Sequence, residues 1–354
     1  MKPGTDERRI GTTHANKEVL FIKNIASFVP ANEKRSMKVT EYFEKANGQT
    51  LISFEVLPPL KGGSMQAIFD TLDPLMEFKP PFIDVTYHRE EFIYKKRESG
   101  YYEKTSIRKR PGTVGICAAI MHRYGVDAVP HLICGGFTQE DTENALIDLN
   151  FLNINNVLAL RGDARQFEGR FIPEEGGHEY AIDMVRQIGQ MNAGKYLDSN
   201  IENGLKTDFC IGIAGYPEKH FESPNFEQDL AFTKAKIEAG ANYIVTQMFF
   251  DNKHYFNYVK ACREAGIDVP IVPGLKPVTK MYQLNSLPRL FHTDLPTELV
   301  KEISNAKNGE ARRQAGIEWC AAQSKELKKA GVPCLHYYTM GDSDTIRSVV
   351  EQVY

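Results

Sequence analysis

The stretch Leu51-Ile-Ser-Phe-Glu-Val-Leu-Pro-Pro59 is a short run of β-forming residues that carries one carboxylate and stops at two prolines. Proline has no backbone N–H to donate to a neighbouring strand, so the strand must end by Leu57. Glu55 therefore lies at the C-terminal end of an otherwise apolar strand. A carboxylate there is costly to bury unless it is solvated, paired or used in chemistry. A lone glutamate at a strand end is most often a structural hydrogen-bond acceptor, so its role depends on what the other strands bring to the same place.

Seven further short apolar runs follow along the chain, separated by loops and by segments of helical periodicity. The apolar runs span residues 82–86, 128–132, 156–160, 208–214, 243–247, 271–273 and 334–337. We expect helices over residues 37–46, 65–78, 139–152, 226–239, 252–265 and 310–330. Several of these helices end at a glycine just before the next strand, which is typical of the returning half of a βαβ unit.

Eight strands that alternate with helices over roughly 300 residues predict an α/β fold, the closed (β/α)8 TIM barrel. The main alternative is an open doubly wound sheet, which usually carries a Gly-x-Gly-x-x-Gly motif after its first strand. The chain has no such motif. The barrel is therefore the favoured fold.

Composition limits the classes of function. The 354 residues are 42% hydrophobic with a net charge of −3, which allows a large core and gives no general attraction to nucleic acids or acidic membranes. The six cysteines form no Cys-x-x-Cys pair, which argues against a zinc site or a disulfide framework and for a reducing compartment. No apolar run approaches the roughly 20 residues that span a bilayer, and the first residues contain no apolar core of a signal peptide. We expect a cytoplasmic protein that binds neither nucleic acid nor membrane.

The first 36 residues are polar and broken, apart from the short apolar run Val19-Leu-Phe-Ile22. We expect residues 1–36 to form an N-terminal extension outside the fold, and residues 37–354 to form a single barrel domain. Met37 opens the first amphipathic helix and is a candidate start of the native chain.

Two long segments interrupt the rhythm, each after a strand end. Residues 87–110 are rich in lysine and arginine, and residues 165–178 are polar. Charge-rich runs are usually solvated, and we expect both segments to be loops. They leave from the C-terminal ends of strands, where barrel active sites lie, so they are placed to lean over a site.

In a barrel, the chemistry is carried by residues at the C-terminal ends of the strands. Taken singly, these residues have ordinary explanations: His131 as a core histidine, Gln247 as a helix cap. Arg161 and Asp163 could pair with each other. Their convergence on one face predicts a polar cavity formed by Glu55, Thr86, His131, Arg161, Asp163, Tyr216, His220, Gln247, Asp251 and Tyr338. The chain lacks His-Glu-x-x-His, Gly-x-Ser-x-Gly and phosphate-loop motifs, so acid/base chemistry with an organic cofactor is favoured over a metal or a covalent nucleophile.

Eight segments, in order along the chain, resemble the methylenetetrahydrofolate reductases. They are Ser53-Phe-Glu-Val-Leu-Pro-Pro59, Val85-Thr-Tyr87, Pro130-His-Leu-Ile-Cys134, Ala159-Leu-Arg-Gly-Asp163, Gly215-Tyr-Pro-Glu-Lys-His220, Ala239-Gly-Ala-Asn-Tyr-Ile-Val-Thr-Gln-Met-Phe-Phe-Asp251, Pro273-Gly-Leu-Lys-Pro277 and His336-Tyr-Tyr-Thr339. The resemblance runs from about Met37 to the C-terminus. We expect the short bacterial type of the family, with the catalytic domain alone and without the regulatory domain of the eukaryotic enzymes.

The resemblance implies a (β/α)8 flavoprotein that binds FAD, takes a hydride from NADH or NADPH and reduces 5,10-methylenetetrahydrofolate to 5-methyltetrahydrofolate in a ping-pong reaction. Such an oxidoreductase acts on a CH–NH donor in one-carbon metabolism and supplies methyl groups for methionine biosynthesis. Glu55 matches the general acid that opens the imidazolidine ring, and Asp163 matches an aspartate near flavin and folate. The residues that match substrate-binding positions of the family are Gln247, Gln283 and Tyr338.

Further positions match the family's FAD contacts: Thr86, His131, Arg161, Gly162, Asp163, Tyr180, Ala181, Tyr216, His220, Asp229, Lys236 and Ala241. We expect Arg161, His220 and Lys236 to meet the diphosphate and ribose, because an anionic diphosphate requires cationic or N–H donors. The resemblance implies no metal, and it implies a homo-oligomer.

Lys276 departs from the family, which usually has an apolar residue at that position. We expect it to be solvated, with a contact to the glutamyl tail of the folate as the alternative. NADH, NADPH and a protein electron donor all stay open as reductants. Two other functions remain as alternatives: a flavin-free pterin-binding barrel enzyme, and a folate or flavin carrier without turnover. The presence of Glu55 together with Asp163 and Gln247 favours an enzyme, because a carrier needs no general acid.

Overall fold

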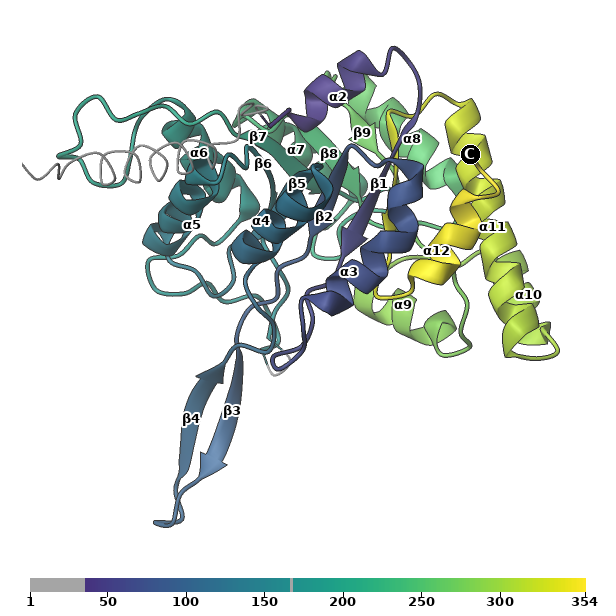
Figure 1. The fold of residues 1–354 in the computed structure, drawn as a ribbon, viewed down its shortest axis with the longest axis horizontal. Helices are drawn as coiled ribbons and strands as arrows, with labels where there is room; N and C mark the ends of the chain where they lie inside the picture. The colour runs from purple at the N-terminus through teal and green to yellow at the C-terminus, as the bar shows by residue number, and fades with distance from the viewer. Residues whose placement is uncertain (1–35, 166–167) are drawn as a thin grey trace, which may run out of the picture. The chain divides into compact units, whose positions relative to one another are not determined.

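A closed barrel of parallel strands forms the centre of the protein. The computed structural model describes residues 36–165 and 168–354 (Figure 1). Neighbouring barrel strands pair in parallel, in the order β10-β11-β1-β2-β5-β6-β7-β8-β9. Their bounds are β1 Leu51–Val56, β2 Phe82–Val85, β5 Asp127–Ile133, β6 Asn156–Leu160, β7 Cys210–Gly215, β8 Tyr243–Thr246, β9 Ile271–Val272, β10 Gly274–Leu275 and β11 Cys334–Tyr338. The predicted (β/α)8 fold is confirmed.

The two ends of this strand order are halves of one barrel strand. β9 pairs with β8, β10 pairs with β11, and only Pro273 separates β9 from β10. Because proline has no N–H to donate, the ladder is interrupted at that residue. Its carbonyl still accepts the N–H of His336 at 3.1 Å. Eight strand positions therefore close into a ring.

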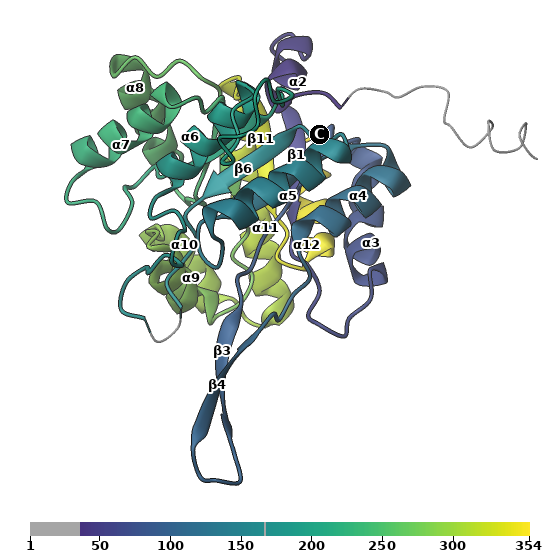
Figure 2. The ribbon, with the colours of Figure 1, turned by 90° about the vertical axis from the view of Figure 1, so that its left-hand side faces the viewer.

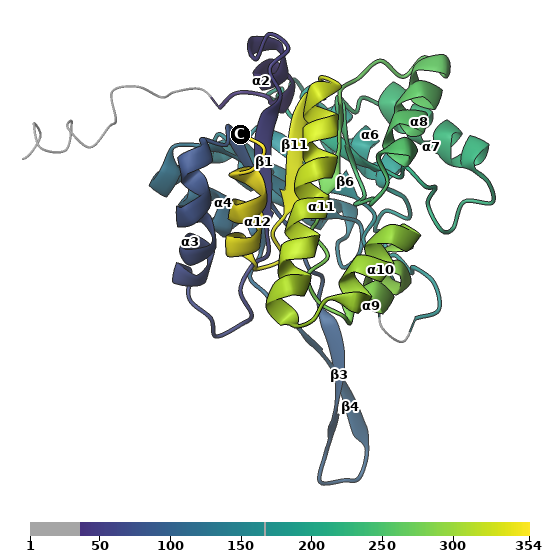
Figure 3. The same cartoon turned by 90° about the vertical axis from the view of Figure 1, so that its right-hand side faces the viewer.

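Most of the helices surround the barrel on its outer side, whereas α2 lies over one of its ends (Figures 2 and 3). Their bounds are α2 Val39–Lys45, α3 Gln66–Leu72, the 3-10 helix η1 Asp73–Phe78, α4 Thr113–Tyr124, α5 Gln139–Phe151, α6 Ala181–Asn192, α7 Phe226–Glu238, α8 Asn252–Glu264, α9 Gln283–Phe291, α10 Thr297–Asn305, α11 Gly309–Lys329 and α12 Ser343–Val350. Each predicted helix is present, while α4, α6, α9, α10 and α12 were not predicted. Within the described ranges, no helix combines the length and apolar character needed to cross a membrane.

Two apolar clusters hold the barrel together. The larger one lies between the strands and the surrounding helices, and it includes Phe54, Leu146 and Ile244. Strand β5 is buried along its whole length, as expected for a parallel strand that is covered on both faces. A smaller cluster joins inward-facing strand residues such as Tyr243 to Val39 of α2.

Helix α2 is tied to the N-terminal ends of two strands. The N–H of Val39 donates to Asn156 Oδ1 at 2.8 Å, and the N–H of Met37 donates to Asp127 Oδ2 at 2.9 Å. Asp127 begins β5 and Asn156 begins β6, so α2 covers this end of the barrel. The opposite end of the barrel, where the strands finish, is not covered by α2 and can hold a site. The predicted extension over residues 1–36 lies outside the described residues, except for Ser36, which is buried.

The lysine- and arginine-rich insertion is a β-hairpin rather than the expected loop. β3 (Glu91–Lys96) and β4 (Tyr102–Ile107) pair antiparallel with each other and join no other strand in the described part of the chain. A turn at 97–101 connects them, with Gly100 at a φ of +85°. The hairpin extends away from the ring of helices (Figure 1), and the outer part of both strands is exposed.

Candidate active site

Glu55 belongs to a row of polar residues across three neighbouring strands. Glu55 of β1 is level with Tyr338 of β11 and with Asp84 of β2. Residues at the same level of adjacent strands point to the same face of a sheet. The Tyr338 hydroxyl donates to Thr246 O of β8 at 2.6 Å, passing over Gly274 of the intervening strand β10. The row therefore faces the barrel interior, near the C-terminal ends of the strands.

Lys276 also faces this interior. A Cβ on Gly274 would overlap Thr246 O and lie 2.5 Å from the Tyr338 hydroxyl, so position 274 points inward. Lys276 is two residues further along an extended segment and therefore points the same way. It is only 6% exposed, and its charge acts on the pKa of Glu55. The expectation that Lys276 is solvated is wrong, because the segment after β10 passes through the barrel mouth rather than over its surface.

Glu55 has the environment of a protonated acid near neutral pH. Its side chain is 14% exposed. Burial is the main cause that raises the pKa of Glu55 to about 7, and the carboxylate of Asp84 raises it further. The nearby His131 and Lys276 lower it. A carboxyl group with this pKa can hold its proton at neutral pH and still release it.

Two buried histidines flank Asp84 behind Glu55. His131 Nε2 lies 3.7 Å from Glu55 Oε2 and 3.5 Å from Asp84 Oδ1. His336 Nδ1 lies 3.8 Å from Asp84 Oδ2 and 2.8 Å from the hydroxyl of Ser53. Both Asp84 oxygens are buried without a hydrogen-bond partner among the described residues. No group of three or more His, Cys, Asp or Glu in the described ranges is arranged to hold a metal ion.

A second polar group lies at the ends of β6 and β7. Arg161 follows β6, and its Nη1 is 2.5 Å from Oε2 of Glu222, which belongs to the loop after β7. Its guanidinium carbon is also 5.1 Å from the centre of the Phe171 ring. Arg161 therefore pairs with Glu222. The sequence had suggested, as the simplest explanation, that Arg161 pairs with Asp163. Burial first, and then the charges of Asp229 and Asp163, raise the pKa of Tyr216 above its usual range.

Helix α6 presents an uncapped N-terminus beside Arg161. Its N-cap residue, Tyr180, has extended backbone and makes no side-chain cap hydrogen bond. The charge of Arg161 acts on the pKa of Tyr180, which places the two residues close together. Ala181 is the first residue of the helix. Free N–H groups at a helix N-terminus, with a cation nearby, favour a bound phosphate or carboxylate.

Asp229 organises the loop that carries His220. Its Oδ2 accepts the N–H of His220 at 3.1 Å, and its Oδ1 accepts the hydroxyl of Ser223 at 2.8 Å. Burial lowers the pKa of His220 below its usual value, so the imidazole is neutral near pH 7. Lys236 donates to Ala214 O at 3.3 Å. Burial lowers the pKa of Lys236 to about 8, although the charge of Asp229 opposes this change.

Asp163 is exposed at the mouth between these two groups. Its charge acts on the pKa of His88 and of Tyr216. Gly162 beside it has a φ of +82°, a left-handed conformation that favours glycine. The hydroxyl of Thr86 lies 3.4 Å from Val56 O and 3.5 Å from Nε2 of His88. Tyr338 is within electrostatic range of both Glu55 and Tyr216, so both groups share one mouth.

The residues expected on the substrate side already make hydrogen bonds within the chain. Gln247 Oε1 accepts the N–H of Met248 at 2.8 Å. Gln283 Oε1 accepts the N–H groups of Thr279 at 2.8 Å and Lys280 at 2.9 Å. The amide oxygens are thus occupied, and the amide NH2 groups remain as donors for a ligand.

Ala241 does not lie with the other expected cofactor contacts. It is 4% exposed and packs in the core just before β8, where its N–H donates to Lys236 O at 3.2 Å. The start of β8 is at the end of the barrel opposite the mouth, so a contact between Ala241 and a cofactor at the mouth is not supported. The other expected cofactor residues lie at strand ends, in the loops that follow, or on α6 and α7.

Sequence reasoning missed three charged or titratable residues near the site: Asp84, His336 and Glu222. Asp84 and His336 each interrupt a strand that is otherwise apolar, which is a signal visible in the sequence. Glu222 lies in a polar loop and carries no such signal.

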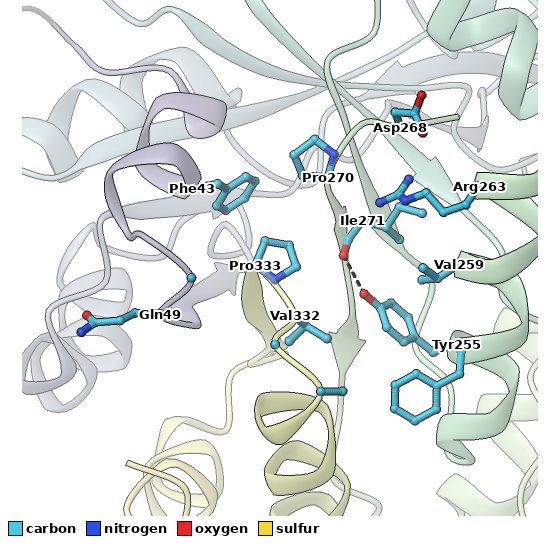
Figure 4. A pocket seen from close by; sticks show the side chains of 14 residues that line it. Phe43, Gln49, Tyr255, Val259, Arg263, Asp268, Pro270, Ile271, Val332 and Pro333 are labelled. Atoms are coloured by element: carbon cyan, nitrogen blue, oxygen red, sulfur yellow. Dashed lines mark hydrogen bonds between the residues drawn. The ribbon is translucent and has the colours of Figure 1, made fainter. Parts of the chain in front are cut away.

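A cavity of about 470 Å³ lies at the other end of the barrel (Figure 4). Its lining includes Phe43, Arg263, Ile271 and Pro333, near the starts of β9 and β11. The Tyr255 hydroxyl donates to Ile271 O at 2.7 Å. None of the expected site residues lines this cavity. In barrel enzymes this end contributes to stability, whereas the chemistry lies at the C-terminal ends of the strands.

Comparison with known proteins identifies the family of the chain. The family model for methylenetetrahydrofolate reductase matches residues 39–354. The chain is 30% identical to the 5,10-methylenetetrahydrofolate reductase of Pectobacterium carotovorum subsp. carotovorum over 321 residues, covering 90% of this chain and 94% of that protein. It is 29% identical to the Escherichia coli (strain K12) protein of the same name over 319 residues, covering 90% and 95%. It is 31% identical to the methylenetetrahydrofolate reductase (NADH) 1 of Arabidopsis thaliana over 316 residues, covering 86% of this chain and 48% of that protein. The chain thus spans about half the length of the plant relative.

Proposed function

Because the chain belongs to the methylenetetrahydrofolate reductase family, we propose that it reduces 5,10-methylenetetrahydrofolate to 5-methyltetrahydrofolate, with FAD at the barrel mouth and NADH or NADPH as hydride donor. The observation that carries this proposal is Glu55, a buried acid with a pKa raised to about 7 at the end of β1. The reaction needs such an acid, because the folate must be protonated before it can accept a hydride.

Glu55 acts as the general acid in this proposal. Its proton goes to N10 of the folate, the bond between N10 and the bridging methylene breaks, and a 5-iminium cation forms. The methylene carbon of that cation is the hydride acceptor. General acid catalysis of this kind typically contributes a factor of about 10² to 10⁴. The low exposure of Glu55 supports the role, because burial keeps the carboxyl protonated at neutral pH.

The residues around Arg161 fit an extended anionic cofactor such as FAD. They supply the cation of Arg161, the partly buried Lys236, the neutral His220 and the uncapped N-terminus of α6. A diphosphate would bind to Arg161 in competition with Glu222. When bound, FAD supplies a carrier that accepts a hydride from the nicotinamide and gives it to the folate. Gly162, with its left-handed backbone, lets the chain turn between Arg161 and Asp163.

Two further groups position the substrate in this proposal. The carboxylate of Asp163, exposed at the mouth, stabilises the iminium cation by its charge. Gln247 and Gln283 offer their NH2 groups to the pterin ring and to the nicotinamide side, since their oxygens are already occupied within the chain. The Tyr338 hydroxyl donates to Thr246 O, so Tyr338 can accept a hydrogen bond or pack against the pterin, but it is not a free donor.

A single anaerobic titration tests the function. The visible spectrum of the purified protein is recorded, NADH is added, and 5,10-methylenetetrahydrofolate follows. We expect a flavin spectrum that bleaches with NADH and returns with the folate, while 5-methyltetrahydrofolate forms in equal amount. A colourless protein that FAD does not reconstitute would favour a flavin-free pterin enzyme. A bound flavin that NADH reduces but folate does not reoxidise would favour a carrier. A flavin that NADH and NADPH leave oxidised would point to a protein electron donor.

We also propose that the enzyme works in the cytoplasm as a homo-oligomer and contributes methyl groups for methionine synthesis. All six cysteines are buried and unpaired, which supports a reducing compartment. The exposed hairpin carries Tyr94, Tyr101 and Tyr102 on its surface and offers a contact between copies. Size-exclusion chromatography with light scattering tests the oligomer, and a monomeric mass at micromolar concentration would contradict it.

A further inference from the structure

Asp84 is a buried carboxylate that the mechanism above does not use. It is 1% exposed, and in strand register it lies between Glu55 of β1 and Val129 of β5. Neither carboxylate oxygen has a hydrogen-bond partner among the residues that the structure describes. A buried charge without hydrogen bonds is strongly unfavourable unless a nearby opposite charge balances it.

His131 is the group that balances this charge. Its Nε2 is 3.5 Å from Asp84 Oδ1 and 3.7 Å from Glu55 Oε2, so one nitrogen lies between both carboxyl groups, although it makes no hydrogen bond among the described residues. Burial alone would lower the pKa of His131, but the contact with Asp84 and the charge of Glu55 outweigh burial and raise it. His336, on the other side of Asp84, has its pKa lowered by burial. The pKa of His131 is therefore shifted toward the protonated form, and the pKa of His336 toward the neutral form.

Other titratable or charged groups lie around this pair. They include His88 after β2, Lys276 after β10, His336 and Tyr338 on β11, and Cys117, Tyr243 and Cys334, on whose pKa values the charge of Asp84 acts. Of these, Lys276 acts on Glu55, and Asp84 has the two imidazoles as its nearest ion-pair partners. The buried group of Glu55, His131 and Asp84 is neutral overall when both Glu55 and His131 are protonated.

We propose that Asp84 and His131 form the proton supply of Glu55. This inference rests on the proposed function, in which each turnover consumes one proton at N10 of the folate. After Glu55 has given its proton away, His131 passes the proton on its Nε2 to Glu55 Oε2, and the N–H bond breaks as the O–H bond forms. The neutral imidazole is then reprotonated at Nε2 by the buffered solvent at the mouth, which supplies the one proton that each turnover consumes. Asp84 favours the protonated form of His131 between turnovers by its charge beside Nε2, so it acts through His131 and does not itself touch the folate.

The test combines Asp84→Asn with a readout that needs no folate. Isotope-labelled histidine allows the protonation of His131 to be followed by NMR in the free protein, with His131→Gln to assign its signal among the nine histidines. We expect the midpoint for His131 to fall by at least about one pH unit in Asp84→Asn, since each pH unit corresponds to a tenfold change in proton affinity. An unchanged midpoint would overturn the proposal, whether or not the protein reduces folate.

The kinetic test compares the two half-reactions. At pH 7.5, we expect Asp84→Asn to slow the folate half-reaction by about tenfold more than the NADH half-reaction, and this difference should shrink at pH 6. Asp127→Asn is the matched control, because Asp127 is also a buried aspartate on a barrel strand but lies at the opposite end, bonded to Met37 and Tyr42. This control should show no pH-dependent difference between the half-reactions. Equal slowing of both half-reactions by Asp84→Asn at every pH would mean a purely structural role.

A second variant keeps the test decisive if Asp84→Asn does not fold. In His131→Gln, the positive charge beside Glu55 is removed, so the ionisation of Glu55 should move to higher pH. Labelled glutamate or infrared difference spectra of the free protein would report this change. If the ionisation midpoint of Glu55 does not change, His131 carries no charge beside it. That result would exclude the proposal that His131 supplies the proton to Glu55.

Discussion

At the scale of single residues, the protonation of Glu55 links its proposed role as general acid to the stability of the fold. The carboxyl group must be protonated to act as an acid, yet its burial makes the ionised form unfavourable for the fold. Both consequences have the same physical origin, which is the removal of the side chain from water. They can be measured separately.

Replacing Glu55 by glutamine removes the acid but keeps the shape. We expect Glu55→Gln to bind FAD and to be reduced by NADH much as the wild type is, and to reduce the folate more slowly by a factor of about 10² or more. In the wild type, the rate of the folate half-reaction should fall as pH rises through about 7, because Glu55 loses its proton there. Stopped-flow measurement of both half-reactions from pH 6 to 9 checks this. Near-normal folate reduction in the variant would remove Glu55 from the mechanism.

The same substitution should stabilise the fold above neutral pH. The pKa of Glu55 is about 7 in the folded chain against an ordinary value of 4.5, so the folded state binds more protons between these values and stability falls as pH rises through this window. Fully developed, the difference corresponds to about 3 kcal/mol. We expect Glu55→Gln to have a higher Tm than the wild type at pH 8 and a much smaller advantage at pH 5. Calorimetry at both pH values tests this, and an equal advantage at both would contradict it.

The sequence identified Glu55 as a candidate acid but gave no account of its surroundings. The prolines after Leu57 mark a strand end, and that information is local. The partners of Glu55 are Asp84, His131 and Lys276, which come from three other places on the barrel. Their proximity depends on strand register and barrel closure, neither of which a local pattern contains. Lys276 was misplaced for the same reason, because a lysine between a leucine and a proline looks solvated unless the path of the chain through the mouth is known.

At the scale of elements, clear start and stop signals made the correct predictions possible. Thr138 caps α5 with Asp141, and glycines with positive φ follow α7, α8 and α11. Two of the helices that were not predicted start weakly or carry a misleading residue. α4 begins after Gly112 without a side-chain cap, and α9 contains Pro288 in its interior. Their helical structure comes from packing against the barrel, which outweighs local preference.

The hairpin was missed because its charges conceal the strand-forming residues. Phe92, Ile93 and Tyr94 favour a strand, but the lysines and arginines around them are typical of a solvated loop. The structure contains both features, since β3 and β4 pair only with each other and their outer parts are exposed. A two-stranded hairpin without a core of its own is only marginally stable in water.

Limited proteolysis should therefore begin in the hairpin. We expect trypsin to cut first at Lys95, Lys96, Arg97 or Lys104, while the two fragments stay together and the barrel remains folded. The lysines of α11 serve as the control, because Lys325 and Lys329 are also exposed but lie on a helix packed against the barrel. They should be cut only after unfolding. Mass spectrometry of early fragments tests this order. Resistance of the hairpin equal to that of α11 would show that something covers it, such as a second copy of the chain.

At the scale of the whole molecule, the two ends of the barrel differ in chemistry. The mouth collects Glu55, Asp84, His131 and Lys276 in one buried group, with Arg161 and its neighbours beside it. The opposite end is covered by α2 and contains the cavity lined by Phe43 and Arg263. The cavity is open space, but apart from Arg263 and Asp268 its lining side chains are uncharged. Charge and perturbed pKa values, rather than cavity size, are therefore the reason for proposing the site at the mouth.

Thermal stability in the presence of FAD can distinguish these two ends directly. A ligand that binds only the folded chain stabilises it by about 2.7 kcal/mol at a concentration 100 times its Kd, so FAD should raise the Tm of the apoprotein. We expect Arg161→Ala to lose most of this increase at a fixed FAD concentration, because the diphosphate loses its cation at the mouth. Arg263→Ala is the matched control: Arg263 lies in the opposite cavity and donates to the carbonyls of Ile267 and Val269. This variant should have a lower Tm without ligand, because those carbonyls lose their donor, but should keep the full increase with FAD. The reverse pattern would place the cofactor at the cavity and remove the mouth from consideration, since a ligand can stabilise the fold only through residues that it contacts in the folded state.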